Sequence, residues 1–255
     1  MRIMDLQKSL TAVLLMLACL ILAPVVHAAK VLPKRMTVDQ VAHLFSSKSS
    51  IATVTMRVVN EDGQRDMSMR IWSLGDKVLI RITSPEDEAG VAILKAGSDI
   101  RYYLPKSKRT VKIPASMAMT SWMGSDFTID DLVKETFLTR DYSITTSFEG
   151  TRGGIAVYEY TLTPKPDAAV VWGKIVLQIR QADSVPTWQG FYDENGALVR
   201  GLTFSEYKTV GGRNIPTRLV MQPADKTGAR TTIDYTDIAF DVPISAATFS
   251  LPNEK

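Results

Sequence analysis

The fold is decided by residues 53–83, which read TVTMRVVNEDGQRDMSMRIWSLGDKVLIRIT. Apolar and polar side chains alternate along three segments of this stretch, and each segment contains β-branched residues. A period of two with β-branched side chains predicts β-strands. The segments are separated by the turn sequences NEDG (60–63) and GD (75–76), so we expect two successive antiparallel hairpins.

The same pattern continues on both sides of this stretch. No long helix alternates with the strands, which excludes a doubly wound parallel sheet and favours one antiparallel meander of about a dozen strands. A sheet this wide has to curl or close. The expected strands are 53–59, 67–74, 77–83, 91–96, 99–104, 109–113, 142–148, 156–163, 174–180, 187–193, 198–210, 217–223 and 231–240.

Two apolar segments are available to cover one face of the sheet. The first is a helix that we expect to start at Thr37, and the second is the interruption from Pro114 to Lys134, which is rich in Met and aromatic residues. In the strand 67–74, Met67, Met69 and Ile71 share one face, as the period of two requires. We therefore expect a curled sheet whose apolar inner face is closed by a helical lid around a cavity.

The N-terminus has the pattern of a secretory signal peptide. Basic residues precede an apolar run from Leu10 to Leu22, and small residues follow at Ala28 and Ala29. We expect cleavage near Ala28, which leaves residues 29–255 as a single domain without cysteine. A retained membrane anchor and lipidation of Cys19 are the two alternatives.

Catalytic and metal sites are disfavoured by the composition. The 255 residues include two histidines and one cysteine, too few for a His/Cys zinc cluster, and no phosphate-binding or nucleophile motif is present. Asp131 follows Thr128 at capping-box spacing, Asp130 is favourable near the positive end of the same helix, and the acidic runs 86–88 and 193–194 lie in expected turns. We expect His43 to be solvated on the polar side of the first helix, so a Ser-His-Asp triad is disfavoured. We therefore expect neither enzymatic activity nor a cofactor.

The charge balance argues against a nucleic-acid partner, because the formal net charge is only +3. A basic stretch nevertheless surrounds the expected turn at residues 104–109. A charged strand edge is the preferred interpretation, and contact with an acidic partner or with lipid headgroups is the alternative. The basic residues are Lys106, Lys108, Arg109 and Lys112.

Two stretches carry a resemblance to a known family. They are RITSPEDEAGVAILKAGSDIRYYLPKSKRTVKI (81–113) and SWMGSDFTIDDL (121–132). The turn at 85–87, the strand end at 102–105, the basic segment at 106–109 and the segment 123–132 resemble the outer membrane lipoprotein-sorting proteins, relatives of the periplasmic lipoprotein carrier LolA. The chain departs from that family at residues 88–91, where a Lys-Gly-Thr turn is frequent, and near Arg101, where a Trp is frequent.

The resemblance implies an unclosed antiparallel β-barrel covered by a few short helices in the periplasm of a Gram-negative bacterium. It also implies a monomeric carrier of lipid or lipoprotein acyl chains that makes transient contact with a membrane or receptor, with an RND-type inner-membrane exporter as a further partner. Because acyl chains need an apolar and adaptable lining, we expect the binding residues to be Leu44, Phe45, Met67, Met69, Ile71, Met117, Met119, Trp122 and Phe127.

Three other functions remain open from the sequence. The first is an accessory subunit of an exporter whose interior is filled by its own side chains. The second is an outer-membrane barrel, which the C-terminal sequence Asn253-Glu254-Lys255 disfavours because a terminal aromatic residue is missing. The third is a hydrolase that uses Asp130 or Asp131.

Overall fold

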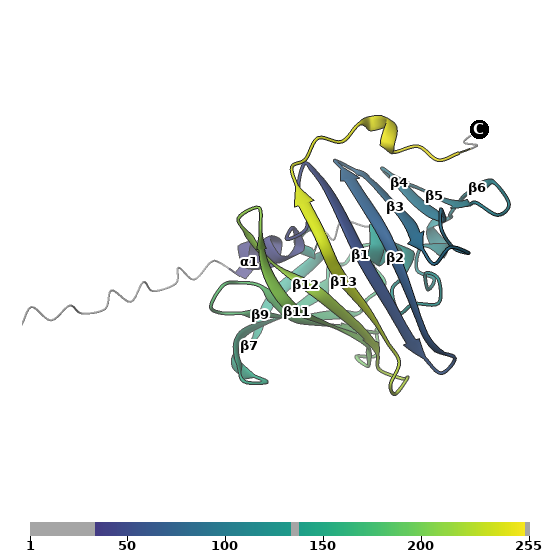
Figure 1. Cartoon of the computed structure of the whole chain (residues 1–255). Coiled ribbons are helices and arrows are strands. Elements are labelled where there is room, and N and C mark those ends of the chain that lie inside the picture. The colour runs from purple at the N-terminus through teal and green to yellow at the C-terminus, as the bar shows by residue number, and fades with distance from the viewer. Residues whose placement is uncertain (1–33, 134–137, 253–255) are drawn as a thin grey trace, which may run out of the picture. The chain divides into compact units, whose positions relative to one another are not determined.

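The computed structural model describes residues 34–133 and 138–252, and its strands form one antiparallel sheet of thirteen (Figure 1). The fold class expected from the sequence is confirmed, because the protein is mainly β with a few short helices. The strands are β1 (Ser49–Asn60), β2 (Gly63–Leu74), β3 (Lys77–Ser84), β4 (Ala92–Ala96), β5 (Asp99–Leu104), β6 (Arg109–Lys112), β7 (Tyr142–Arg152), β8 (Ile155–Pro164), β9 (Lys174–Arg180), β10 (Pro186–Tyr192), β11 (Leu198–Val210), β12 (Arg213–Pro223) and β13 (Arg230–Phe240).

The order of the strands differs from a simple meander at one point. The order across the sheet is β6-β5-β4-β3-β2-β1-β13-β12-β11-β10-β9-β8-β7, so the first and last strands pair in the middle. In Figure 1, β13 lies between β12 and β1. The two edge strands, β6 and β7, are neighbours in the sequence but do not pair within the described sheet. The sheet is therefore interrupted between β6 and β7, at the segment 114–134 where the sequence predicts an interruption, because this connection is too long and too apolar to act as a hairpin turn.

Five short helices accompany the sheet within the described ranges. They are α1 (Lys34–Ala42), η1 (Ala115–Met117), α2 (Ile129–Val133), α3 (Leu138–Asp141) and η2 (Ala246–Thr248). The first helix begins at Lys34 and not at Thr37, so the predicted start was wrong. Lys, Arg and Met are strong helix formers, which explains why the helix extends toward the N-terminus past the expected cap. The predicted signal peptide, its cleavage point at Ala28 and Cys19 lie outside the described residues.

The inner face of the sheet holds the main hydrophobic core. Met67 and Met69, which we expected on this face, are 1% exposed, and Ile71 packs against the same cluster. Val38 of α1 and Trp122, Phe127, Ile129 and Val133 from the connection between β6 and β7 belong to the cluster as well. The prediction that the first helix and this connection cover the apolar face is therefore confirmed.

The outer face carries a smaller core under the C-terminal strap, which we define as residues 242–252. Phe249 and Leu251 of the strap pack on Leu79, Ala92 and Leu94 of β3 and β4. Trp72, whose face is opposite to that of Met69 and Ile71, packs against this second cluster. The sheet is therefore covered on different faces by different ends of the chain.

None of the helices in the described part of the chain has the length and apolar character needed to cross a bilayer.

Candidate functional site: the lid and the inner face of the sheet

The connection between the two edge strands crosses the inner face and forms the candidate site. We call residues 114–133 the lid segment. Its central part turns back on itself, since the amide of Trp122 donates to the carbonyl oxygen of Phe127 at 2.9 Å and an isolated bridge joins Ser121 and Thr128. Trp122 and Phe127 are 2% and 4% exposed, so this small loop directs two aromatic side chains into the core.

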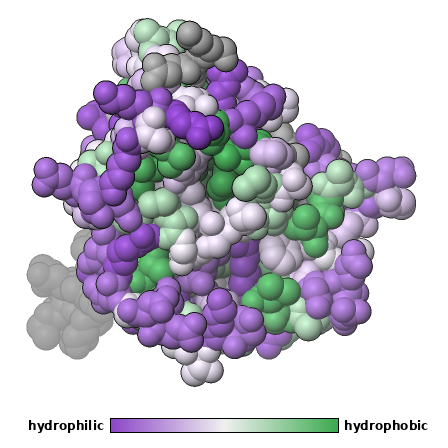
Figure 2. Space-filling view, turned by 90° about the vertical axis from the view of Figure 1, so that its right-hand side faces the viewer, coloured by the Kyte–Doolittle hydropathy of each residue, from purple (hydrophilic) through white to green (hydrophobic). Residues whose placement is uncertain are grey.

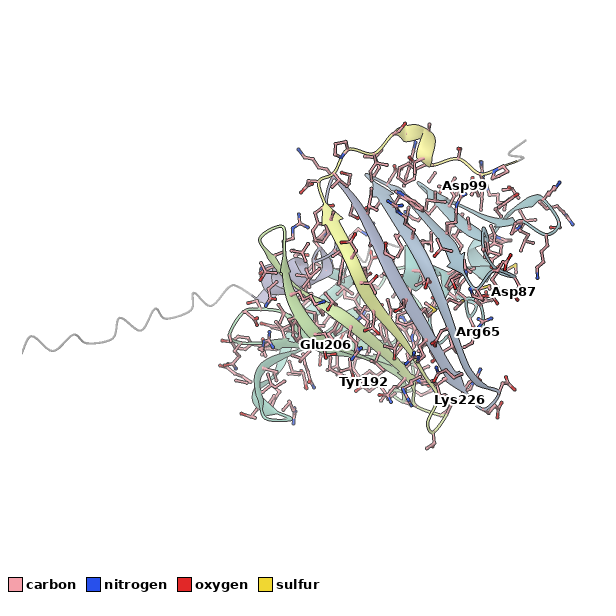
Figure 3. All side chains as sticks on the ribbon, in the orientation of Figure 1. Arg65, Asp87, Asp99, Tyr192, Glu206 and Lys226 are labelled. Carbon is pink, nitrogen blue, oxygen red and sulfur yellow. The ribbon has the colours of Figure 1, made fainter. Side chains whose placement is uncertain are left out.

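The turn of this loop is stabilised by polar contacts from the first half of the sheet. Arg65 of β2 donates to the carbonyl oxygen of Met123 and forms an ion pair with Glu88 at 2.8 Å. Figure 3 shows Arg65 close to the turn that carries Asp87. The hydroxyl of Tyr102 lies 3.1 Å from the sulfur of Met123. Burial raises the pKa of Tyr102, which keeps this hydroxyl protonated as a donor.

The end of the lid segment is attached to the second half of the sheet by a buried arginine. Arg200 of β11 is 6% exposed and pairs with both carboxylate oxygens of Asp131 at 2.7 Å each. The guanidinium also donates to the carbonyl oxygen of Asp126 at 3.1 Å. It lies 4.8 Å from the ring centre of Trp172 and 4.7 Å from that of Phe191. A bidentate pair beside two aromatic rings, which also contact each other, holds α2 in one orientation.

A second contact joins the lid segment to β13. The side chain of Thr231, which is fully buried, donates to the carboxylate of Asp126 at 2.7 Å and accepts from the amide of Asp126 at 2.9 Å. The lid segment is thus bound to β2 on one side and to β11 and β13 on the other. These attachments are made by side chains at the rim of the sheet, and the apolar contacts lie between them.

The predicted binding residues occupy three different environments. Met67, Met69, Trp122 and Phe127 meet in the main core with Ile71 at its margin. Leu44 is buried at 8% exposure, and the ring of Phe45 stacks on that of Tyr235 with the ring centres 5.0 Å apart. Met119 is half-buried, whereas Met117 is 48% exposed. The structure therefore brings five of the nine together on the inner face and places Met117 at the surface.

The inner face is lined by methionines that the sequence analysis did not single out. Met56 and Met221 are at most 1% exposed and share the core with Met67 and Met69. A thioether side chain has three rotatable bonds and adapts to neighbours of different shape. The core beneath the lid segment is consequently both filled and deformable.

A hollow of about 340 Å³ opens beside the turn of the lid segment. Arg65, Met123 and Gly124 form one part of its wall, and the hairpin between β1 and β2 forms the other. Val58, which is 5% exposed and a member of the main core, also lines it. We call it the mouth hollow, because it is a place where core side chains and solvent meet. Another hollow, of about 350 Å³, lies on the outer face around Trp188.

The residues considered for catalysis have structural partners. Thr128 and Asp131 form the expected capping box, with the amide of Thr128 donating to Asp131 at 2.8 Å and the amide of Asp131 donating to Thr128 at 3.1 Å. His43 is exposed, as expected, and contacts the carbonyl oxygen of Asp39 at 2.8 Å. In the ranges that the structure covers, no three His, Cys, Asp or Glu side chains gather as a metal site.

Sequence reasoning missed both arginines that hold the lid segment. Arg200 lies in a predicted strand, whereas Arg65 lies two residues before the strand predicted at 67–74, and neither was distinguished from other charged residues. A signal was available for Arg200, since it shares its strand face with Leu202 and therefore interrupts an apolar face. Arg65 precedes Met67 and Met69 on the same face by the same rule.

The comparisons with known proteins agree with this architecture. A family model described as "Uncharacterized protein" matches residues 75–253. No curated protein matches the chain. The crystal structure of a DUF1329 family protein from Desulfovibrio piger is similar with a TM-score of 0.75 at 22% identity, over 85% of this chain and 95% of that one.

Two further crystal structures are similar over comparable lengths. A domain described as an outer membrane lipoprotein-sorting protein domain, from Vibrio parahaemolyticus, has a TM-score of 0.73 at 25% identity, over 85% of this chain and 95% of that one. A LolA superfamily protein from Nitrosomonas europaea has a TM-score of 0.71 at 21% identity, over 86% of this chain and 98% of that one. The chain therefore belongs to the family that this model describes, and it shares its fold with the outer membrane lipoprotein-sorting domain and the LolA superfamily protein, as its sequence resemblance indicated.

Proposed function

We propose that this protein is a periplasmic carrier that shelters the acyl chains of a lipid or a lipoprotein between the lid segment and the inner face of the sheet, and that it transfers them toward the outer membrane. The family supports the carrier class, since the similar structures include a lipoprotein-sorting domain and a LolA superfamily protein. No bond is made or broken in this function. Residues 29–255 act as the single carrier domain after removal of the signal peptide.

The observation that best supports the proposal is how the lid segment is attached to the sheet. Trp122 and Phe127 fill the inner face, yet the rim attachments are polar contacts from a few side chains, namely Arg65, Arg200 and Thr231. Loss of these contacts frees the aromatic side chains to leave the core. The methionines that remain then form a lining suited to chains of different length and shape.

The energetic balance permits exchange between the lid segment and a ligand. An acyl chain of about a dozen carbons gains roughly 10 kcal/mol from burial, at about 0.8 kcal/mol per CH₂, before the costs of ordering are subtracted. This gain offsets the apolar contacts that the two aromatic side chains lose when they are displaced. The lid segment then regulates both entry and release.

An accessory subunit of an inner-membrane exporter, such as one of the RND type, is the second candidate. The observation that favours it is the filling of the inner face by the protein's own side chains, among them Met56, Met67 and Met69. A subunit of this kind acts through its surface and has no need of a displaceable lid. The two candidates therefore differ in whether motion of the lid segment changes binding.

A reversible disulfide across the lid contact distinguishes them. Asp126 and Thr231 are in direct side-chain contact, so the variant Asp126→Cys/Thr231→Cys is designed to lock the lid segment when oxidised. The matched control is Ser50→Cys/Ser73→Cys, whose hydroxyl oxygens are 2.7 Å apart on β1 and β2, away from the lid segment. Binding of 11-dansylaminoundecanoic acid is measured by fluorescence on residues 29–255, with circular dichroism as the check on folding.

We expect the lid variant to bind the probe when reduced and to lose at least tenfold in affinity when oxidised, while the control binds equally in both states. Native mass spectrometry of protein purified gently from its own periplasm should also show co-purifying lipid or acylated protein. Equal binding by the oxidised and reduced lid variant contradicts the proposed site. A protein that is always empty, binds no probe and associates with an inner-membrane exporter is an accessory subunit.

A further inference from the structure

Positive charge is concentrated in one part of the chain. Residues 100–125 contain five basic residues and no acidic residue, whereas the whole chain has 30 basic and 27 acidic residues. The five are Arg101, Lys106, Lys108, Arg109 and Lys112. Charge separation of this extent within a nearly neutral protein creates a local positive potential.

The fold places the excess of positive charge at the tip of the hairpin formed by β5 and β6. At the base, Asp99 pairs with both Arg101 and Lys112 at 2.7 Å. Lys106, Lys108 and Arg109 are exposed at the tip, on the edge strand of the sheet and the turn before it. Figure 1 shows this hairpin standing out from the rest of the sheet.

One exposed apolar side chain lies beside the cations at the tip, and a second lies beyond the base of the hairpin. Leu104, which ends β5 beside the basic turn, is 37% exposed. Met117, in the lid segment that directly follows β6, is 48% exposed. The side of Figure 1 that carries β4, β5 and β6 faces the viewer in Figure 2, where green apolar residues lie among hydrophilic ones.

We propose that the β5–β6 hairpin docks on the surface of a membrane that contains anionic lipids. Clustered cations are attracted to anionic headgroups, and apolar side chains next to them gain free energy by entering the boundary between headgroups and acyl chains. An acidic protein surface would satisfy the cations but would leave Leu104 without an apolar environment. Because β6 leads directly into the lid segment, docking brings the lid to the lipid surface. The inference does not depend on the proposed carrier function.

Vesicle flotation tests the docking surface on residues 29–255. The probes are vesicles of phosphatidylethanolamine with phosphatidylglycerol and vesicles of phosphatidylcholine alone. The variant Lys106→Glu/Lys108→Glu/Arg109→Glu reverses the charges at the hairpin tip. The control Lys208→Glu/Lys226→Glu/Arg230→Glu makes the same change of net charge at exposed positions on β11, β13 and the turn before β13. Figure 3 shows Lys226 far from Asp99, which marks the base of the hairpin.

We expect the native protein to float with anionic vesicles and not with zwitterionic ones, and the bound fraction to fall as salt is added. Each cation near an anionic surface contributes roughly a factor of five to partitioning, so the hairpin variant should lose at least about a hundredfold in partitioning and the control much less. Equal losses in the two variants, or no preference for anionic vesicles, would overturn the proposal. Capture of an acidic protein without any vesicle binding would overturn it as well. Unchanged thermal unfolding of the variants shows that the loss is not a folding defect.

Discussion

Arg200 is the residue on which the orientation of the lid segment depends most. Its guanidinium is buried, and its carboxylate partner, Asp131, is 19% exposed at the side chain. Removal of the cation leaves Asp131 with Thr128 and solvent as its remaining partners. The cost of breaking a buried pair is therefore reduced here by partial solvation of the group that remains.

We predict that Arg200→Met lowers the free energy of unfolding by about 2 kcal/mol. Methionine retains apolar packing against Trp172 and Phe191, so the loss reports mainly on the ion pair. The matched control is Arg218→Met, which removes an exposed pair with Asp234 at 2.7 Å and should cost less than about 1 kcal/mol. Urea unfolding gives both values. Equal losses of unfolding free energy in the two variants would show that the burial of Arg200 does not strengthen its ion pair.

The sequence predicted one part of the site and missed the other for a physical reason. Met67, Met69, Trp122 and Phe127 were found because periodicity and apolar character are local properties of the chain. The partners of Arg200 lie far away in the sequence, in the lid segment, and no local pattern specifies which distant carboxylate a strand arginine meets. Long-range polar pairs of this kind become visible only once the strands are placed.

The lid segment depends on its capping box as an element. Thr128 and Asp131 satisfy each other's amides at the start of α2, and Asp131 also pairs with Arg200. The cap therefore both begins the helix and aims the carboxylate toward β11. Loss of the Thr128 hydroxyl should weaken both functions at once.

We predict that Thr128→Ala destabilises the protein by about 1 kcal/mol, whereas Thr128→Ser retains most of the stability. Hydrogen exchange followed by mass spectrometry should show faster exchange in residues 118–133 for the alanine variant and little change in β1 or β2. Uniform acceleration across the sheet, or an equal effect of serine, would contradict a role confined to the lid segment.

The strands and the hairpins that join neighbouring strands were well predicted. All thirteen strands lie close to the expected ranges, because hairpin turns and a period of two are strong local signals. The pairing of β1 with β13 was not predicted, since either edge of a meander presents the same free backbone groups. The pairing of β1 with β13 is decided by the lid segment, because this segment keeps β6 and β7 apart while it covers the core.

The stability of the whole sheet should decrease at alkaline pH. Burial raises the pKa of Tyr142 from 10.0 to about 12, with a smaller contribution from the charge of Asp141, and burial also raises the pKa of Tyr207 and Tyr235 to about 12. Between about pH 10 and about pH 12, these three tyrosines keep their protons in the folded protein, whereas the same tyrosines in the unfolded chain have lost them. The free energy of unfolding should therefore be constant below about pH 10 and fall as the pH rises toward 12.

Urea unfolding at several pH values from about 8 to 12 measures this decline. Tyr142→Phe removes one of the three titrations and should make the decline shallower without changing stability near pH 8 by more than about 1 kcal/mol. A decline that is just as steep in the variant would show that Tyr142 does not contribute to it.

The pairing of the first strand with the last also sets the order in which the chain can fold as it emerges. The array β1 to β6 and the array β7 to β12 consist of strands paired with their sequence neighbours, so each can form before the rest of the chain has emerged. The seam between residues 49–60 and residues 230–240 forms only after nearly the whole chain has emerged. Until β13 arrives, β1 presents an unpaired edge in the centre of the future sheet, and a chaperone that covered this edge would protect the nascent protein from aggregation.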